Sequence, residues 1–161
     1  MSKTTPTSKT NYWLAKSEAD CYSIDDLKKD KKTHWNGIRN YQARNFMRDG
    51  MKQGDLVLFY HSNACPPGVV GVAKVVKEAY PDHTQFDPDD DHFDPKSTQE
   101  NPRWVMVDLS YVEKFKHELS LEELRSHKEL ADMLVLRKGQ RLSLMPVEAK
   151  EFELVRKMGN E

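Results

Sequence analysis

The residues best suited to bind another molecule lie close together between positions 33 and 44. Trp35 offers a broad ring face, and one base–aromatic stack is worth about 1–3 kcal/mol. The amides of Asn36 and Asn40 both donate and accept hydrogen bonds, as the reading of a base edge requires. Arg39 and Arg44 are suited to phosphate contacts. The segment therefore predicts a nucleic-acid contact, and the alternative is that Trp35 is simply part of the core.

The motifs of several enzyme classes are missing. The chain has no glycine-rich dinucleotide fingerprint, no P-loop and no G-x-S-x-G elbow. His61 and Cys65 are neighbours in sequence, but nothing orients them as a base and a nucleophile. The acidic run Asp87–His92 starts like a calcium loop, yet its sixth position is His92 and its twelfth is Thr98, where glycine and glutamate are needed. We expect no catalysis, no metal and no other cofactor.

Strands and capped helices must position the central segment. Apolar runs predict strands over residues 12–16, 55–61, 69–80, 104–115 and 141–145. Ser23 is expected to be the N-cap of a helix, with Asp26 where a capping box wants Glu or Gln, and Ser120 with Glu123 predicts a second helix start by a capping box. A third helix is expected over residues 41–49, with Asn40 as its N-cap and a glycine at its end. Pro146 predicts the start of a last helix, where its missing N–H costs little.

This arrangement of elements favours an α+β fold. We expect a partly closed β-barrel of five to six strands with short peripheral helices, because the strands do not alternate with long helices. The 161 residues fit one domain at residues 11–159, after a flexible tail at residues 1–10. The irregular stretch at residues 81–102 has few apolar anchors, so we expect it to be a mobile rim of the site.

Charge gives no overall support to nucleic-acid binding, because 25 basic and 26 acidic residues leave a net charge of −1. A basic face would have to come from local segregation of charge. Arg39, Arg44 and Arg48 surround one helix start, so we expect a basic patch there. The acidic loop at residues 87–94 should lie away from that patch or at its edge.

The segment Trp35–Arg44 resembles the W-x-G-[IV]-R-N-x-Q-A-R signature of the EVE domain family. Further similarities cover nearly the whole chain after the tail, at residues 12–18, 60–63, 78–84, 102–108 and 140–146. The resemblance implies a PUA-like fold akin to the YTH domain. It also implies recognition of a modified base in DNA or RNA, with 5-methylcytosine and 5-hydroxymethylcytosine as proposed ligands.

The resemblance also implies site residues. Trp35 would be one wall of an aromatic cage and Asn36 its polar neighbour, while Lys16 and Ser17 match a Lys-Ser pair beside the YTH pocket. The resemblance does not identify the second wall of the cage, for which Trp104, Phe86, Phe93 and Tyr60 are all candidates. His61, the neighbour of Tyr60, is also expected to line the pocket. Contacts to the nucleic-acid backbone are expected from Arg39, Asn40, Gln42, Arg44 and Arg48. The family often has proline where this chain has Ala19, which puts only the pocket rim in doubt.

The sequence thus predicts a monomeric module that binds nucleic acid containing a modified base and contacts no membrane. Two alternatives stay open: a PUA-like enzyme of the nuclease type acting on RNA, and a receptor for a free nucleoside-like ligand. The tail lacks the apolar stretch of a secretory signal. We expect an intracellular protein, cytoplasmic if the source is bacterial and nuclear if it is eukaryotic.

Overall fold

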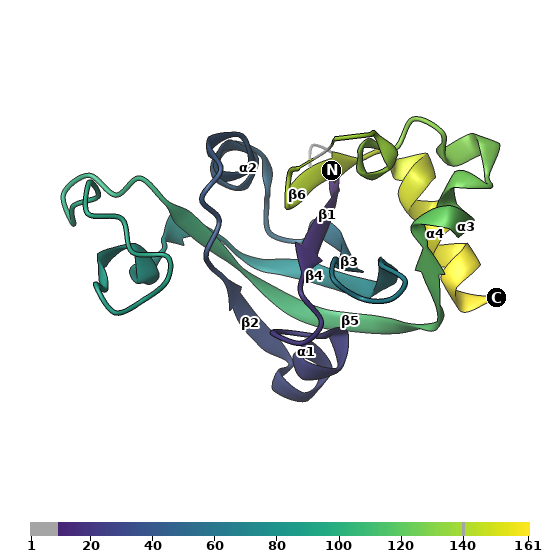
Figure 1. Ribbon diagram of the computed structural model, residues 1–161, viewed down its shortest axis with the longest axis horizontal. Helices are drawn as coiled ribbons and strands as arrows, with labels where there is room; N and C mark the ends of the chain where they lie inside the picture. Colours follow the sequence, from purple (N-terminus) through teal and green to yellow (C-terminus); the bar gives the residue numbers. More distant parts are fainter. Residues whose placement is uncertain (1–9, 140) are drawn as a thin grey trace, which may run out of the picture.

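A curved six-stranded sheet forms the centre of the computed structural model, with short helices around it (Figure 1). The structure describes residues 10–139 and 141–161, so the expected tail lies outside it except for Thr10. The strands are β1 (Tyr12–Ser17), β2 (Lys32–Trp35), β3 (Leu56–His61), β4 (Gly68–Pro81), β5 (Val105–Ser120) and β6 (Leu144–Val147). The α-helices are α1 (Ile24–Asp30), α2 (Tyr41–Asn45), α3 (Leu121–Arg125) and α4 (Ala149–Asn160).

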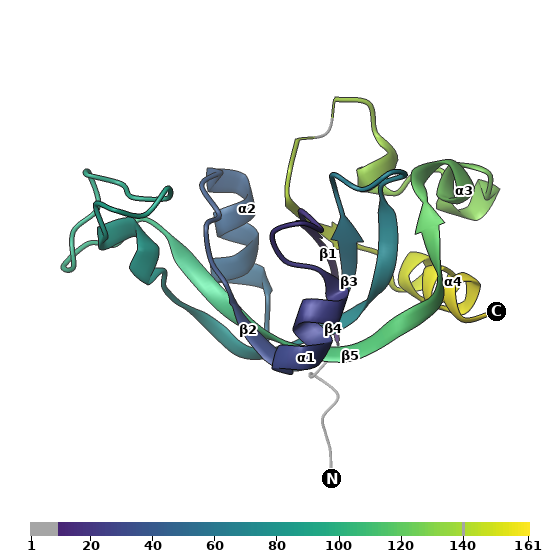
Figure 2. The same cartoon turned by 60° about the horizontal axis from the view of Figure 1, so that its bottom comes forward.

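The sheet is mixed and open. Its strand order is β2-β5-β4-β3-β1-β6, with β1 parallel to β3 and every other pair antiparallel. The expected number of strands is confirmed, but β2 and β6 remain free edges and the sheet does not close. Register shifts along β4 and β5 bend these long strands (Figure 2), because a bulge increases local bend and twist.

Two faces of the sheet bury different sets of side chains. Trp13 packs against Phe46 after α2, with ring centroids 5.8 Å apart, on what we call the α2 face. Its neighbour Tyr12 stacks on Phe152 of α4 at 4.5 Å, on the α4 face. Side chains alternate between faces along a strand. Phe59 and His61 therefore share the α2 face, because their parallel partners on β1 are two and four residues from Trp13.

The helix starts follow the sequence closely. Ser23 and Ser120 form the expected capping boxes, and the Asn40 side chain accepts a hydrogen bond from the Ala43 amide. The predicted helix over residues 41–49 is α-helical only to Asn45 and continues as a π-helical turn, Phe46–Gly50. Strand β2 was not predicted, because its four residues are too few for an alternation to be visible.

The prediction for Pro146 is wrong. It lies in β6 opposite Trp13, and α4 begins only at Ala149 with Glu148 as its N-cap residue. The reason is that β6 is an edge strand, where a residue without an N–H leaves no ladder hydrogen bond broken.

The long segment between β4 and β5 has a polar anchor that the sequence did not reveal. It contains one 3₁₀ turn, His83–Phe86, which carries the fully buried Gln85. The Gln85 amide donates to the carbonyls of Asp82 and Trp104, at 2.7 and 2.8 Å. Its oxygen accepts from the Arg103 and Trp104 amides and from the Ser97 hydroxyl. The segment is therefore tied down by these polar contacts as well as by the buried Trp104.

Candidate nucleic-acid interface

Three aromatic rings form a continuous cluster on the α2 face. Phe59 contacts Trp35 edge-on, with centroids 5.5 Å apart, and His61 in the same way at 5.7 Å. Phe59 is fully buried, whereas Trp35 and His61 keep 8% and 7% of their surface exposed. Phe59 therefore holds both rings in orientation from beneath. Sequence reasoning missed it, because nothing in a strand of apolar residues marks one member as a support.

Trp35 differs from the other two tryptophans in its indole N–H. That of Trp13 donates to Asp55 at 3.0 Å, and that of Trp104 donates to Asp94 at 2.7 Å. The Trp35 N–H has no partner among the described residues. No buried polar side-chain atom of this part of the chain lacks a partner, so the Trp35 N–H must reach solvent. The ring is largely buried, but its polar edge is available to a ligand.

His61 and Ser17 add polar groups to the α2 face, where His61 contacts Phe59. The Nε2 atom of His61 accepts a hydrogen bond from the Ile24 amide at 3.1 Å, so the neutral ring carries its proton on Nδ1. Burial is the main cause that lowers the pKa of His61, and it keeps this neutral form. Ser17 lies opposite His61 in the β1–β3 register and donates its hydroxyl to the Tyr22 carbonyl. Its oxygen can still accept a hydrogen bond.

The turn after Trp35 is fixed by glycine. Gly37 has a φ of +82°, and a Cβ there would lie 2.9 Å from the His92 ring. The backbone conformation therefore disfavours a side chain, and an added Cβ would have to displace the exposed His92 ring. The Gly37 amide donates to Asp82 at 2.8 Å. This places Asn36 as an exposed side chain immediately after the tryptophan.

Asp82 and Arg39 lock the same turn from the other side. Asp82 is fully buried, and its carboxylate accepts from the Thr84 amide and hydroxyl and from Arg39 Nη1 at 3.1 Å. Burial works to raise the pKa of Asp82, but the hydrogen bonds from Thr84, Gly37 and Arg39 together hold it below its ordinary value. Arg39 also donates twice to the His92 carbonyl, at 2.9 and 2.7 Å. Its guanidinium is thus used inside the fold.

The expected basic patch is therefore wrong for two of its three arginines. Arg39 is paired with Asp82, and Arg48 with Asp49 at 2.9 Å. The acidic loop meets Arg39 through the backbone carbonyl of His92, so it borders this arginine and does not lie away from it. Only Arg44 has no carboxylate partner among the described residues. Of the other expected backbone contacts, Asn40 serves as the helix cap and Gln42 is exposed.

Trp104 belongs to a different cluster from Trp35. It is 5% exposed and stacks on Tyr41 with centroids 4.9 Å apart and an interplanar angle of 27°. The guanidinium carbons of Arg39 and Arg44 lie 5.4 and 5.9 Å from its ring. In the described part of the chain no ring contact joins it to Trp35. Sequence reasoning also missed Tyr41, whose exposure depends on how α2 docks.

The remaining pocket candidates lie elsewhere. Lys16 and Tyr60 pair in register and project onto the α4 face, where the ammonium is 5.7 Å from the Tyr60 ring. The sheet therefore separates them from Trp35. Phe86 is half-buried in the 3₁₀ turn and Phe93 is 37% exposed; no ring contact of either with Trp35 is found in the described residues. Trp35 and His61 both contact Phe59, Ser17 pairs in register with His61, and Asn36 follows Trp35 along the chain.

One group of potential metal ligands lies close together in the described chain: Glu18, Asp20 and Cys21, all exposed after β1. Desolvation and the nearby carboxylates raise the pKa of the Cys21 thiol. Exposed acidic groups of this kind are common without a metal ion. Among the described helices, none combines the length and the apolar character needed to cross a bilayer.

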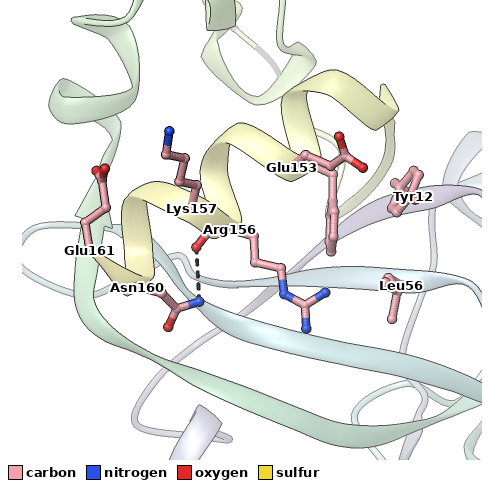
Figure 3. Close-up of a pocket in the computed structure, with 8 residues that line it drawn as sticks. Tyr12, Leu56, Glu153, Arg156, Lys157, Asn160 and Glu161 are labelled. Atoms are coloured by element: carbon pink, nitrogen blue, oxygen red, sulfur yellow. Dashed lines mark hydrogen bonds between the residues drawn. The ribbon is translucent and has the colours of Figure 1, made fainter.

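A cavity of about 540 Å³ lies far from this interface, between α4 and the starts of β1 and β3 (Figure 3). Its floor is formed by Tyr12, Leu56 and Phe152. Arg156 at its side is paired with Glu113, and the Asn160 amide donates to the Arg156 carbonyl. Arg156 is thus already neutralised, whereas Lys157, the other cation of the lining, has no ion pair among the described residues.

Comparison with known proteins places the chain in a family. The EVE domain profile matches residues 11–158, and the chain belongs to the EVE domain family. Thymocyte nuclear protein 1 of rat is 46% identical over 164 aligned residues, which cover 91% of this chain and 72% of that protein. The open six-stranded sheet is accordingly the α+β, PUA-like fold of this family.

Solved structures agree with this assignment. A hypothetical protein from Leishmania major superposes with a TM-score of 0.90 at 46% identity, covering 96% of this chain and 97% of that one. Human THYN1 protein in complex with 5-methylcytosine containing DNA superposes with a TM-score of 0.87 at 43% identity. That alignment covers 94% of this chain and 99% of the human one.

Proposed function

We propose that this chain binds DNA by recognising 5-methylcytosine at the α2 face, without catalysis. The observation that carries the proposal is its likeness to human THYN1 bound to 5-methylcytosine containing DNA, over almost the full length of both chains. The free indole N–H of Trp35 supports placing the ligand site on the α2 face.

The polar groups of the site suit a cytosine edge. Cytosine presents two acceptors, N3 and O2, and one amino donor, N4. Trp35 Nε1 and His61 Nδ1 are donors for the acceptors, and the Ser17 oxygen or the Asn36 carbonyl can accept from the amino group. We assign Trp35, Ser17, His61 and Asn36 to the base. We assign Phe59 to their support.

The target base must leave its helical stack to reach this site. Trp35 and His61 are more than nine-tenths buried, so a paired base cannot approach them edge-on. Extruding a base costs a few kcal/mol, and less when its pair is already weakened. The chain should therefore bind 5-methylcytosine more tightly opposite a mismatch or an abasic site than opposite guanine.

The site favours binding over the nuclease alternative. Nuclease chemistry needs a metal or a general acid–base pair. Nε2 of His61, the nearest titratable base, is occupied by the Ile24 amide. The third hypothesis, a receptor for a free nucleoside, predicts little dependence on salt, whereas phosphate contacts give a steep dependence.

One panel of oligonucleotides tests these hypotheses. Matched DNA and RNA strands with cytosine, 5-methylcytosine or 5-hydroxymethylcytosine at one position are titrated by fluorescence anisotropy at several salt concentrations. We expect tightest binding to methylated DNA, a negative salt slope and intact strands afterwards. Equal affinity for cytosine and 5-methylcytosine would refute the proposal, and strand cleavage would favour the enzyme. If the source is eukaryotic, we expect the protein in the nucleus, as the relatives' name states of them.

A further inference from the structure

A stacked pair of rings beside α2 is not used by the base site. Tyr41, Trp104 and Arg44 form what we call the Tyr41 platform. We propose that this platform is a second DNA contact, on which a nucleobase flanking the modified cytosine stacks while Arg44 binds its phosphate. The inference rests on the proposed function and extends it from one base to a short strand.

The first argument is exposure. Tyr41 is 52% exposed and is one of two large hydrophobic side chains in the described chain that remain open to solvent. It stands at the first position of α2, where the core cannot use it. An aromatic ring left in solvent beside cationic side chains is the usual arrangement of single-strand binding surfaces.

The second argument is rigidity. The Tyr41 ring lies nearly parallel to Trp104 at 4.9 Å, so one of its faces is supported by a buried ring. Trp104 is itself held through its indole N–H by Asp94 and through its backbone by Gln85. A ring that is already fixed in its plane loses little conformational entropy when a base stacks on it.

The third argument is that the outer ring face of Tyr41 is open. Arg44 lies 4.8 Å from the Tyr41 ring and 5.9 Å from Trp104. If Arg44 covered the face of the Tyr41 ring that is opposite Trp104, the Arg44–Trp104 distance would approach the sum of the Arg44–Tyr41 and Tyr41–Trp104 distances. It is much shorter, so Arg44 lies over the Tyr41 ring on the side of Trp104 and does not cover the opposite, outer face of Tyr41.

The fourth argument is charge. Arg44 donates to the Arg103 carbonyl and to the neutral Asn45 amide, and it has no ion pair in the described part of the chain. Its orientation is thus fixed without a direct carboxylate partner, although its charge, after the hydrogen bond from Arg48, also lowers the pKa of the nearby Asp49 carboxyl. Arg39 and Arg48, by contrast, are neutralised by carboxylates. Phosphate is the complementary ligand for such a guanidinium.

The fifth argument is position. Tyr41 follows Trp35 by six residues, so the two lie within ~20 Å of each other even for a fully extended backbone. The start of α2 and the long segment that carries Trp104 rise on the same side of the sheet (Figure 2). A strand of a few nucleotides can therefore contact both sites at once.

An abasic walk tests the platform directly. Single-stranded 9-mers carry one central 5-methylcytosine, and each flanking base is removed in turn. For the wild-type protein we expect one flanking position whose removal weakens binding roughly 10- to 100-fold, the effect of a lost stack. Tyr41→Ala should bind the intact strand more weakly by the same factor, and the abasic penalty at that position should disappear. Tyr41→Phe, which keeps the ring, should behave as the wild type.

Arg44→Gln is the matched test of the phosphate contact, with Arg48→Gln as the control because Arg48 is already paired. The slope of log affinity against log salt concentration should become shallower in Arg44→Gln only, by about the amount that one phosphate contact contributes. An unchanged affinity of Tyr41→Ala, or an abasic penalty that persists in it, would overturn the platform. A wild type that does not distinguish methylated from unmodified cytosine would instead refute the proposed function, while the walk still measures the platform.

Discussion

Replacing Trp35 by alanine tests two roles of this residue at once. The side chain is 92% buried, and tryptophan side chains bury about 150–250 Å². At ~25 cal/mol per Å², this corresponds to roughly 4–6 kcal/mol as an upper bound. Measured truncations of buried aromatic residues cost about 3–5 kcal/mol, a large part of the ~5–15 kcal/mol that holds a domain folded. We therefore expect Trp35→Ala to lower Tm by roughly 6–20 °C.

Since such a loss would hide any effect on binding, Trp35→Phe is the sharper variant. It keeps a ring against Phe59 but removes the indole N–H, so DNA affinity should fall by about 0.5–1.5 kcal/mol, the net value of one hydrogen bond. Trp13→Phe is the matched control, because Trp13 is equally buried and its N–H bonds to Asp55 inside the core. It should be destabilised while the folded protein keeps its affinity.

The assay is anisotropy titration of methylated DNA at a temperature where melting curves show each variant to be folded. A well-folded Trp35→Phe with wild-type affinity would show that the indole N–H touches no ligand. Loss of affinity in the control variant as well would mean that binding reports the integrity of the core, and the assignment of the site would have to be withdrawn.

Three further outcomes concern the turn after Trp35, which Asp82 and Gly37 fix, and the buried ring of His61. Asp82→Asn leaves the Arg39 cation without its buried partner, so urea unfolding should show a loss of about 3–5 kcal/mol; a loss below 1 kcal/mol would contradict this. Gly37→Ala must adopt a left-handed backbone, at about 1–2 kcal/mol, and displace His92, so DNA affinity should fall with stability; wild-type affinity would exclude a role for this turn. Because the pKa of His61 is lowered in the fold, the unfolded chain binds more protons below pH ~6.5, and stability should decline as pH falls from there. His61→Gln should lack that part of the decline, and an identical pH profile would refute the buried neutral ring.

Much of the local structure could be predicted from the sequence alone. Ser23, Asn40 and Ser120 mark their helix starts correctly, because a cap is a contact between residues two or three apart. The strands β3, β4 and β5 follow their apolar runs, because such a run is also a pattern of residues close together in the sequence. The signature from Trp35 to Arg44 identified the family, and with it the fold.

The composition of the site was decided by tertiary structure. Strand alternation sends Lys16 and Ser17 to opposite faces of the sheet, although they are neighbours in the motif. Docking of the segment before β5 brings Trp104 onto Tyr41 and away from Trp35. These outcomes depend on strand register and packing, which join residues far apart in the chain.

The charges show the same division. The sequence supplies three arginines around one helix start, but it does not show which of them meets a carboxylate. Asp82 lies 43 residues from Arg39, and only the fold joins them. A buried carboxylate must find its cation and hydrogen-bond donors, because an unpaired buried charge is too costly. The sequence therefore determined which groups are available, and the packing of the long segment against the turn after Trp35 determined that Arg39 is paired, whereas Arg44 forms no ion pair in the described part of the chain.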